Sequence, residues 1–221
     1  MLGLIKEKIR KTKAYDYFGN QLFIRRAEAF DRKHNVETAR EVRLHELEID
    51  SPNVKHGVFY AGTDPKSFRG IWDHLKIKLE DFVFIDLGSG KGRALLMASE
   101  LPFKKIIGVE FSSELNTIAC KNILNFKNAE QKCRDIEAVC QDATLFVPPF
   151  EPCIFYVFNA FHAGIVAEVL KNLEKSFNEN PREIYFIYAN PVHLDVLQEN
   201  RFFEEFYSDI WYSIYKNPSR N

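Results

Sequence analysis

Long apolar runs are missing from this chain of 221 residues. A helix that spans a membrane needs about 20 predominantly apolar residues in succession, so we expect no membrane span. The first thirteen residues, MLGLIKEKIRKTK, contain no uninterrupted apolar stretch and do not resemble a signal peptide. These two absences predict a cytoplasmic protein.

Paired cysteines are missing as well. The chain contains no C-x-x-C pair, and no histidines follow its four cysteines at the sequence spacing of a zinc site; the cysteines are Cys120, Cys133, Cys140 and Cys153. The pattern favours reduced thiols over disulfides and predicts no metal site.

An overall charge excess is the third absence, because 30 Lys and Arg residues stand against 31 Asp and Glu residues. This balance gives no general electrostatic reason to expect nucleic acid or an anionic membrane as a partner. Positive charge gathers locally in residues 1–45, either as a solvated helical face or as a surface that faces a substrate or partner. The aromatic residues of a base-stacking surface are not interleaved there, which makes nucleic acid an unlikely acceptor. No pattern indicates an oligomeric state.

Apolar periodicity predicts the fold class. Five strands that alternate with helical patterns are predicted at residues 82–87, 105–110, 136–140, 153–158 and 183–189, of which 136–140 is the weaker. Such alternation predicts a doubly wound α/β fold, with helices on both faces of a parallel sheet. Residues 201–218 hold two apolar-rich runs split by Ser208-Asp209, which predicts a C-terminal antiparallel hairpin. The complete sheet is therefore expected to have seven strands, most of them parallel.

A helical N-terminal extension is predicted in front of this domain. Helical spacing of apolar residues occurs in the first dozen residues and again within residues 20–35. Asp64-Pro65 is a helix start, because Asp caps free amides and Pro suits the first turn, and that helix is expected to reach Leu75. We divide the chain into an extension, 1–56, and a ligand-binding domain, 57–221, and expect residues 20–45 to be structural.

The most informative stretch is Asp86-Leu87-Gly88-Ser89-Gly90-Lys91-Gly92, directly after the first predicted strand. Glycines permit positive φ in a tight turn and let the backbone approach a ligand closely. Ligands of doubly wound sheets bind at the carboxyl ends of strands. The candidate ligand-binding residues of this turn are Asp86, Gly88, Ser89, Gly90 and Gly92.

Two acids follow later strands. Glu110 ends the second strand, where a carboxylate can accept both hydroxyl hydrogens of a ribose; the alternative is a surface residue, and in either case we expect it to contribute little to folding. Asp142 follows the third strand and can accept from the exocyclic amine of an adenine, with Ala143 leaving room for the ring. Asp142 is equally compatible with an ordinary loop acid.

Together these residues resemble the class I S-adenosylmethionine-dependent methyltransferases over residues 60–217, where FIDLGSGKGR is similar to the family's first motif. The resemblance implies a Rossmann-like fold, S-adenosylmethionine as cofactor, and methyl transfer as the activity. It implies that Glu110, next to Phe111, binds the ribose and that Asp142 and Ala143 lie at the adenine. The form D-L-G-S-G-x-G-R resembles members that modify protein lysines.

The resemblance places the acceptor at the end of the fourth strand. Asn159 stands where amine-directed members carry Asp or Asn before Pro-Pro and an aromatic residue, and here Ala160 and Phe161 follow instead. This departure argues against a nucleobase or amide acceptor. His162 is a candidate base, because imidazole is the usual general base near neutral pH, or else a capping or packed surface residue. His193, after the fifth strand, is a further candidate.

Tyr60 and Thr63 precede the first strand and are candidates for contacting the methionine end of the cofactor, or members of an ordinary loop. The favoured acceptor is a protein amine or a small metabolite. Two alternatives stay open. One is a nicotinamide-dependent oxidoreductase, whose motif is G-x-G-x-x-G; in this chain Arg93 stands at the position of the last glycine. A non-catalytic cofactor-binding protein is the other.

Overall fold

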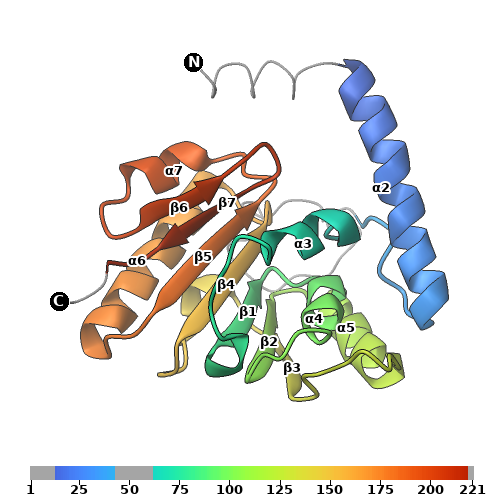
Figure 1. The fold of residues 1–221 in the computed structure, drawn as a ribbon, viewed down its shortest axis with the longest axis horizontal. Coiled ribbons are helices and arrows are strands. Elements are labelled where there is room, and N and C mark those ends of the chain that lie inside the picture. Colours follow the sequence, from blue (N-terminus) through green and yellow to red (C-terminus); the bar gives the residue numbers. More distant parts are fainter. Residues whose placement is uncertain (1–12, 43–61, 219–221) are drawn as a thin grey trace.

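The structure is a computed structural model that describes residues 13–42 and 62–218. Its centre is a seven-stranded sheet of order β3-β2-β1-β4-β5-β7-β6 (Figure 1). The strands are β1 (Val83–Leu87), β2 (Lys105–Glu110), β3 (Ile136–Cys140), β4 (Cys153–Phe158), β5 (Ile184–Ala189), β6 (Glu204–Ser208) and β7 (Tyr212–Lys216). β1 to β5 are parallel, and β7 is antiparallel to both β5 and β6. The predicted mostly parallel sheet and its C-terminal hairpin are confirmed.

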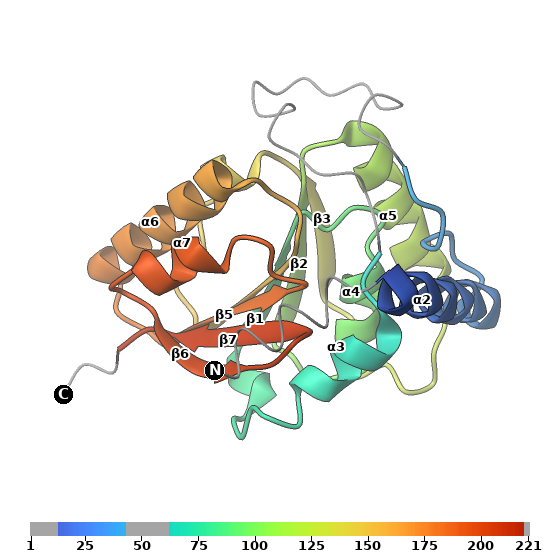
Figure 2. The same ribbon diagram turned by 90° about the horizontal axis from the view of Figure 1, so that it is seen from above.

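Helices cover both faces of the sheet, as Figure 2 shows. α6 and α7 lie on one face, and α2 to α5 lie on the other. The helical elements are α2 (Lys13–His34), α3 (Pro65–Ile71), η3 (Leu79–Asp81), α4 (Arg93–Ala98), α5 (Ser113–Asn125), η4 (Ala143–Leu145), α6 (Ala163–Glu179) and α7 (Leu194–Glu199). This two-sided cover confirms the doubly wound class.

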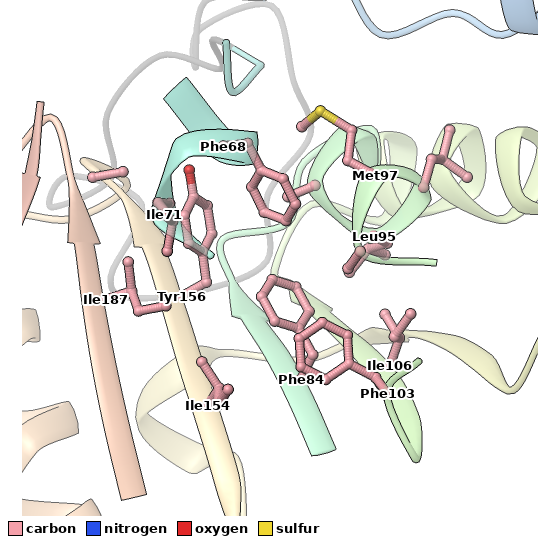
Figure 3. Packing of buried hydrophobic residues seen from close by; sticks show 14 of the residues in the cluster. Phe68, Ile71, Phe84, Leu95, Met97, Phe103, Ile106, Ile154, Tyr156 and Ile187 are labelled. Atoms are coloured by element: carbon pink, nitrogen blue, oxygen red, sulfur yellow. The ribbon is translucent and has the colours of Figure 1, made fainter. Parts of the chain in front are cut away.

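The central strand β1 is buried at all five positions, as expected for a short apolar run with helices on both sides. Phe84 points to the face of α3 and α4, where Phe68 and Tyr156 complete an aromatic core (Figure 3). The rings of Phe68 and Phe84 meet edge to face with centroids 6.0 Å apart, and those of Phe68 and Tyr156 at 5.5 Å. The strand order reverses between β1 and its neighbour β4, so the ends of these two strands form the switch point.

The helix predicted from Asp64 begins as expected but is shorter. The Asp64 carboxylate accepts from the Ser67 amide at 3.0 Å and caps α3, which confirms the start. The helix ends at Ile71 instead of continuing to Leu75. Trp72 packs edge to face against Phe68, with centroids 5.4 Å apart, and so holds the following turn against the core without a further helical turn.

The N-terminal extension is part of the fold as far as the structure describes it. α2 begins at Lys13, earlier than the predicted 20–35. Ala27 and Phe30 are buried, and the ring of His34 lies 4.9 Å from that of Phe126 at the end of α5. Burial lowers the pKa of His34. Residues 20–42 are therefore structural, as expected. The first dozen residues and the domain boundary at 56/57 lie outside the described residues.

No helix among the described residues is both long and apolar enough to cross a membrane. The four cysteines are free, with Cys133 and Cys153 buried and Cys140 exposed. Within residues 13–42 and 62–218, no three His, Cys, Asp or Glu side chains are grouped so that they would hold a metal ion.

Candidate active site

The turn after β1 has the backbone that its glycines predict. Gly88, Gly90 and Gly92 have φ values of 78°, 53° and 83°, in the left-handed region that side chains disfavour. A Cβ atom added at Gly88 would lie 2.4 Å from the Cβ of Ala160, and one at Gly92 would lie 3.2 Å from that of Ala119. Both the φ angles and the close approaches therefore require glycine.

The amides of this turn are already hydrogen-bonded within the protein. Gly88 and Ser89 donate to the Val109 carbonyl at 2.8 and 3.1 Å, and Gly92 donates to the Ser89 carbonyl at 2.8 Å. Gly90 donates to the Glu110 carboxylate at 2.8 Å. A pyrophosphate is bound by free amides at such a turn. These four amides are therefore not free to bind a pyrophosphate, which fits a cofactor without phosphate, such as S-adenosylmethionine.

Glu110 is buried, with 4% of its surface exposed. Its two oxygens accept from the amides of Gly90 and Ser112 at 2.8 and 2.9 Å, which fixes the turn against the start of α5. Burial raises the pKa of Glu110 to about 7. Burial also raises the pKa of the Asp86 carboxyl, and the nearby Glu110 charge adds to that rise. The alternative of a surface residue is therefore wrong, while the expectation that Glu110 contributes little to folding stays a prediction. Each oxygen retains a lone pair that can accept from a ribose hydroxyl.

The adenine-side candidates lie at the ends of β2 and β3. The Asp142 carboxylate caps η4 by accepting from the Thr144 amide at 2.9 Å and from its hydroxyl at 2.8 Å. Ala143 and Phe111 are half-buried. The side chain of Ser89, by contrast, lies against β2, because a Cβ atom added at Gly108 would lie 2.8 Å from its hydroxyl. Ser89 therefore contributes backbone rather than its hydroxyl to the turn.

Asn159 and Asn190 occupy matching positions after β4 and β5. The residues before them, Phe158 and Ala189, are partners in the parallel register. Both asparagines have positive φ, 42° and 47°. Asn tolerates this left-handed conformation better than most residues. The two strand ends thus turn in the same way.

Each of these asparagines begins an Asn-x-x-His sequence, NAFH at 159–162 and NPVH at 190–193. His162 and His193 precede α6 and α7, and their ring centroids lie 6.2 Å apart. The structure therefore brings the two histidine candidates together. The sequence analysis missed the pairing of the asparagines, although the repeated Asn-x-x-His spacing was a visible signal.

The acceptor-side segment touches the glycine turn. Ala160 lies against Gly88, and the Phe161 ring approaches the same glycine, its Cζ 3.4 Å from an added Cβ. The two candidate halves of the site, one after β1 and the other after β4, are therefore in direct contact.

Thr63 is held by hydrogen bonds on two sides. Its hydroxyl accepts from Tyr156 of β4 at 3.1 Å, and its carbonyl accepts from Arg93 of α4 at 3.2 Å. Tyr60 lies outside the described residues. Arg93, which the sequence showed only as a departure from the dinucleotide motif, is thus a structural partner of the segment before α3.

Comparisons with known proteins agree with this geometry. The model of the family described as histone methylation protein DOT1 matches residues 41–133, which is less than half of the chain. No curated protein matches the sequence.

Three solved structures share the fold. A candidate S-adenosyl-L-methionine-dependent methyltransferase from Methanococcus maripaludis has a TM-score of 0.52 and 17% identity, covering 71% of this chain and 86% of its own. The candidate methyltransferase yhhF from Escherichia coli has a TM-score of 0.51 and 17% identity, and the match covers 79% of this chain and 92% of yhhF. A candidate RNA methyltransferase from Pyrococcus horikoshii has a TM-score of 0.50 and 19% identity, covering 78% and 93%.

The seven-stranded order and the likeness to these structures show that the chain has the Rossmann-like methyltransferase fold. The family match covers residues 41–133 of this fold.

Proposed function

We propose that the protein transfers the methyl group of S-adenosylmethionine to an amine nitrogen that enters beside Asn159, and that this amine belongs to a protein or a small metabolite. The observation that carries the proposal is the contact of Ala160 and Phe161 with Gly88. It makes the donor and acceptor halves of the site adjoin at the switch point of the sheet.

The cofactor is assigned to the residues around the glycine turn. Gly88, Gly90 and Gly92 give the backbone room to approach it, with Asp86 beneath the turn, and Glu110 accepts from the ribose hydroxyls. We assign Phe111, Asp142 and Ala143 to the adenine and Thr63 to the methionine end. The assignment of Tyr60 to the methionine end rests on the sequence alone, because Tyr60 lies outside the described residues.

Bound S-adenosylmethionine supplies a methyl group whose bond to sulfur breaks, leaving the electron pair on sulfur, as the lone pair of the acceptor nitrogen forms the new bond. Much of the acceleration then comes from holding the acceptor in line. Asn159 is suited to this task, because its side-chain carbonyl can accept a hydrogen bond from an acceptor N–H. Its positive φ at a strand end is the kind of backbone strain that occurs at functional turns.

An amine nucleophile reacts only without its extra proton. His162 and His193 lie on the same rim, with ring centroids 6.2 Å apart, and an imidazole titrates near neutral pH. We assign them the role of taking that proton from the acceptor nitrogen.

A protein amine is the first acceptor to test, because the family whose model matches residues 41–133 is described as methylating histones. RNA must be tested beside it, because one of the structures with the same fold is described as a candidate RNA methyltransferase. At 19% identity, the similarity to this structure concerns the fold and does not identify the acceptor.

The cofactor test is a thermal melt with S-adenosylhomocysteine, NAD or NADP. A ligand at a hundred times its Kd adds about 2.7 kcal/mol to the free energy of unfolding, which for a domain of this size raises the melting temperature by roughly 5–11 °C. We expect that shift with S-adenosylhomocysteine alone. A shift with a nicotinamide and none with the sulfur ligand would refute the assignment.

The acceptor test follows transfer of a tritiated methyl group to lysine-rich proteins, RNA and small amines in parallel. We expect label in protein or small amines, and about a 10²–10⁴-fold loss in the double variant His162→Gln/His193→Gln if these residues act as the base. Asn159→Gly can keep the left-handed backbone conformation and removes the whole side chain, including the amide that is proposed to orient the acceptor. Label in RNA would refute the acceptor class, and cofactor binding without transfer to any of the three would favour the non-catalytic alternative.

A further inference from the structure

Arg93 is a fully buried cation that joins three separate parts of the chain. It is the first residue of α4, directly after Gly92, and only 1% of it is exposed. Its Nε donates to the Thr38 hydroxyl at 2.7 Å, Nη2 donates to the Thr38 carbonyl, and Nη1 donates to the Thr63 carbonyl at 3.2 Å. Burying a charge costs free energy unless the charge is hydrogen-bonded. These three hydrogen bonds offset that cost and fix the orientation of the guanidinium.

The charge of Arg93 is balanced through Thr38 by an acid in α2. The Thr38 hydroxyl donates to one oxygen of Asp31 at 2.5 Å, and the amides of Thr38 and Ala39 donate to the other at 2.6 Å. Arg93, Thr38 and Asp31 therefore form a continuous chain of hydrogen bonds from the glycine turn to α2.

Two neighbouring side chains fasten the same segment. Lys91, inside the glycine turn, pairs with the Glu37 carboxylate at 2.8 Å although its own side chain is only 1% exposed. Asn122 of α5 accepts from the Glu37 amide at 2.9 Å and donates to the Glu37 carbonyl at 3.0 Å and the Lys91 carbonyl at 2.9 Å. Residue 37 is thus docked both to the glycine turn and to α5.

The segment before α3 is docked by the same guanidinium. A Cβ atom added at Gly62 would lie 2.6 Å from the Arg93 Cζ, so the backbone passes directly over it. Thr63 next to it is bonded to both Arg93 and Tyr156. Arg93 therefore fixes two segments, 37–39 and 62–63, relative to the left-handed Gly92.

We propose that Arg93 is a positioning residue for the cofactor, which couples the docking of residues 37–39 and 62–63 to the conformation of the glycine turn. The inference rests on the proposed function, because it takes the methyl-donor cofactor as the ligand of that turn. Coupling is reciprocal: docking of the N-terminal segment strengthens cofactor binding, and cofactor binding strengthens the docking.

The first experiment measures the Kd of S-adenosylhomocysteine by calorimetry well below the melting temperature of each protein. Arg93→Lys keeps the charge and loses the fork of donors, and is expected to weaken binding by about 5- to 150-fold, the usual range for coupled sites. Arg69→Lys is the matched control, because the Arg69 side chain is 55% exposed and pairs with Glu100 at 3.5 Å on the surface. A lower melting temperature with the wild-type Kd would mean a purely structural arginine and would overturn the proposal.

The second experiment tests the reciprocal effect by hydrogen exchange. S-adenosylhomocysteine should slow exchange of the Thr38 and Ala39 amides in the wild type and in Thr38→Ser, which keeps the hydroxyl. It should have less effect in Thr38→Val, which has the same shape without the hydroxyl. Equal protection in both variants would overturn the proposal. Wild-type protein that binds no S-adenosylhomocysteine would instead refute the proposed function, and the inference with it.

Discussion

The contact between the two halves of the active site can be tested at Gly88. Gly88→Ala forces a side chain into a residue with φ of 78° and places its Cβ 2.4 Å from that of Ala160. The left-handed conformation costs about 1–2 kcal/mol, and overpacking costs typically about 1–3 kcal/mol. Together they predict a loss of about 2–5 kcal/mol, or roughly 4–20 °C in melting temperature for a domain of this size.

A double-variant cycle separates the two costs. Gly88→Ala/Ala160→Gly removes the clash but keeps the backbone strain, so it should recover about 1–3 kcal/mol relative to the additive expectation. Gly164→Ala is the matched control, because a Cβ there meets nothing within 4 Å and the residue lies in α6. That control should raise stability by about 0.5–1 kcal/mol.

Thermal and urea unfolding give the free energies of unfolding of these variants, and calorimetry with S-adenosylhomocysteine gives their affinity for the cofactor product. Because Ala160 adjoins Asn159, we expect Gly88→Ala to weaken cofactor binding as well. Wild-type stability of Gly88→Ala, with no interaction energy in the cycle, would show that the segments after β1 and β4 do not touch as described.

Two further predictions concern titration and the N-terminal helix. Burial raises the pKa of Glu110 from 4.5 to about 7, so the folded protein holds a proton that the unfolded chain releases, and this carboxyl should lower the free energy of unfolding as the pH rises through that interval. Cofactor binding is expected to need the ionised Glu110 carboxylate, so the affinity for S-adenosylhomocysteine should rise over the same pH interval by up to about tenfold per pH unit. Calorimetry of Glu110→Gln should show a weaker dependence of affinity on pH. The same pH dependence in the wild type and the variant would contradict the ribose role. Phe30→Ala, at a side chain only 5% exposed, should cost about 3–5 kcal/mol in urea unfolding. Leu22→Ala, at a residue of the same helix that is 54% exposed, should cost far less, and equal losses would argue against the docking of α2.

Local signals in the sequence were sufficient for the sheet and for the turn. The run 82–87 is apolar except for Asp86 because its strand is covered on both faces, and glycines stand at 88, 90 and 92 because the turn needs positive φ at all three positions. The Asp64-Pro65 start was recognisable because capping involves only neighbouring residues. Such features are determined within a few residues, so periodicity and residue type reveal them.

The tertiary structure alone decided which polar residues are buried and what they hold. Glu110 looked like a strand-end acid until the fold brought it to the amide of Gly90, twenty residues away. Arg93 found its partners 30 and 55 residues upstream, at Thr63 and Thr38. The pairing of Asn159 with Asn190 required the register between β4 and β5. Burial and pairing depend on segments far apart in the chain, and a single sequence carries no distance between them.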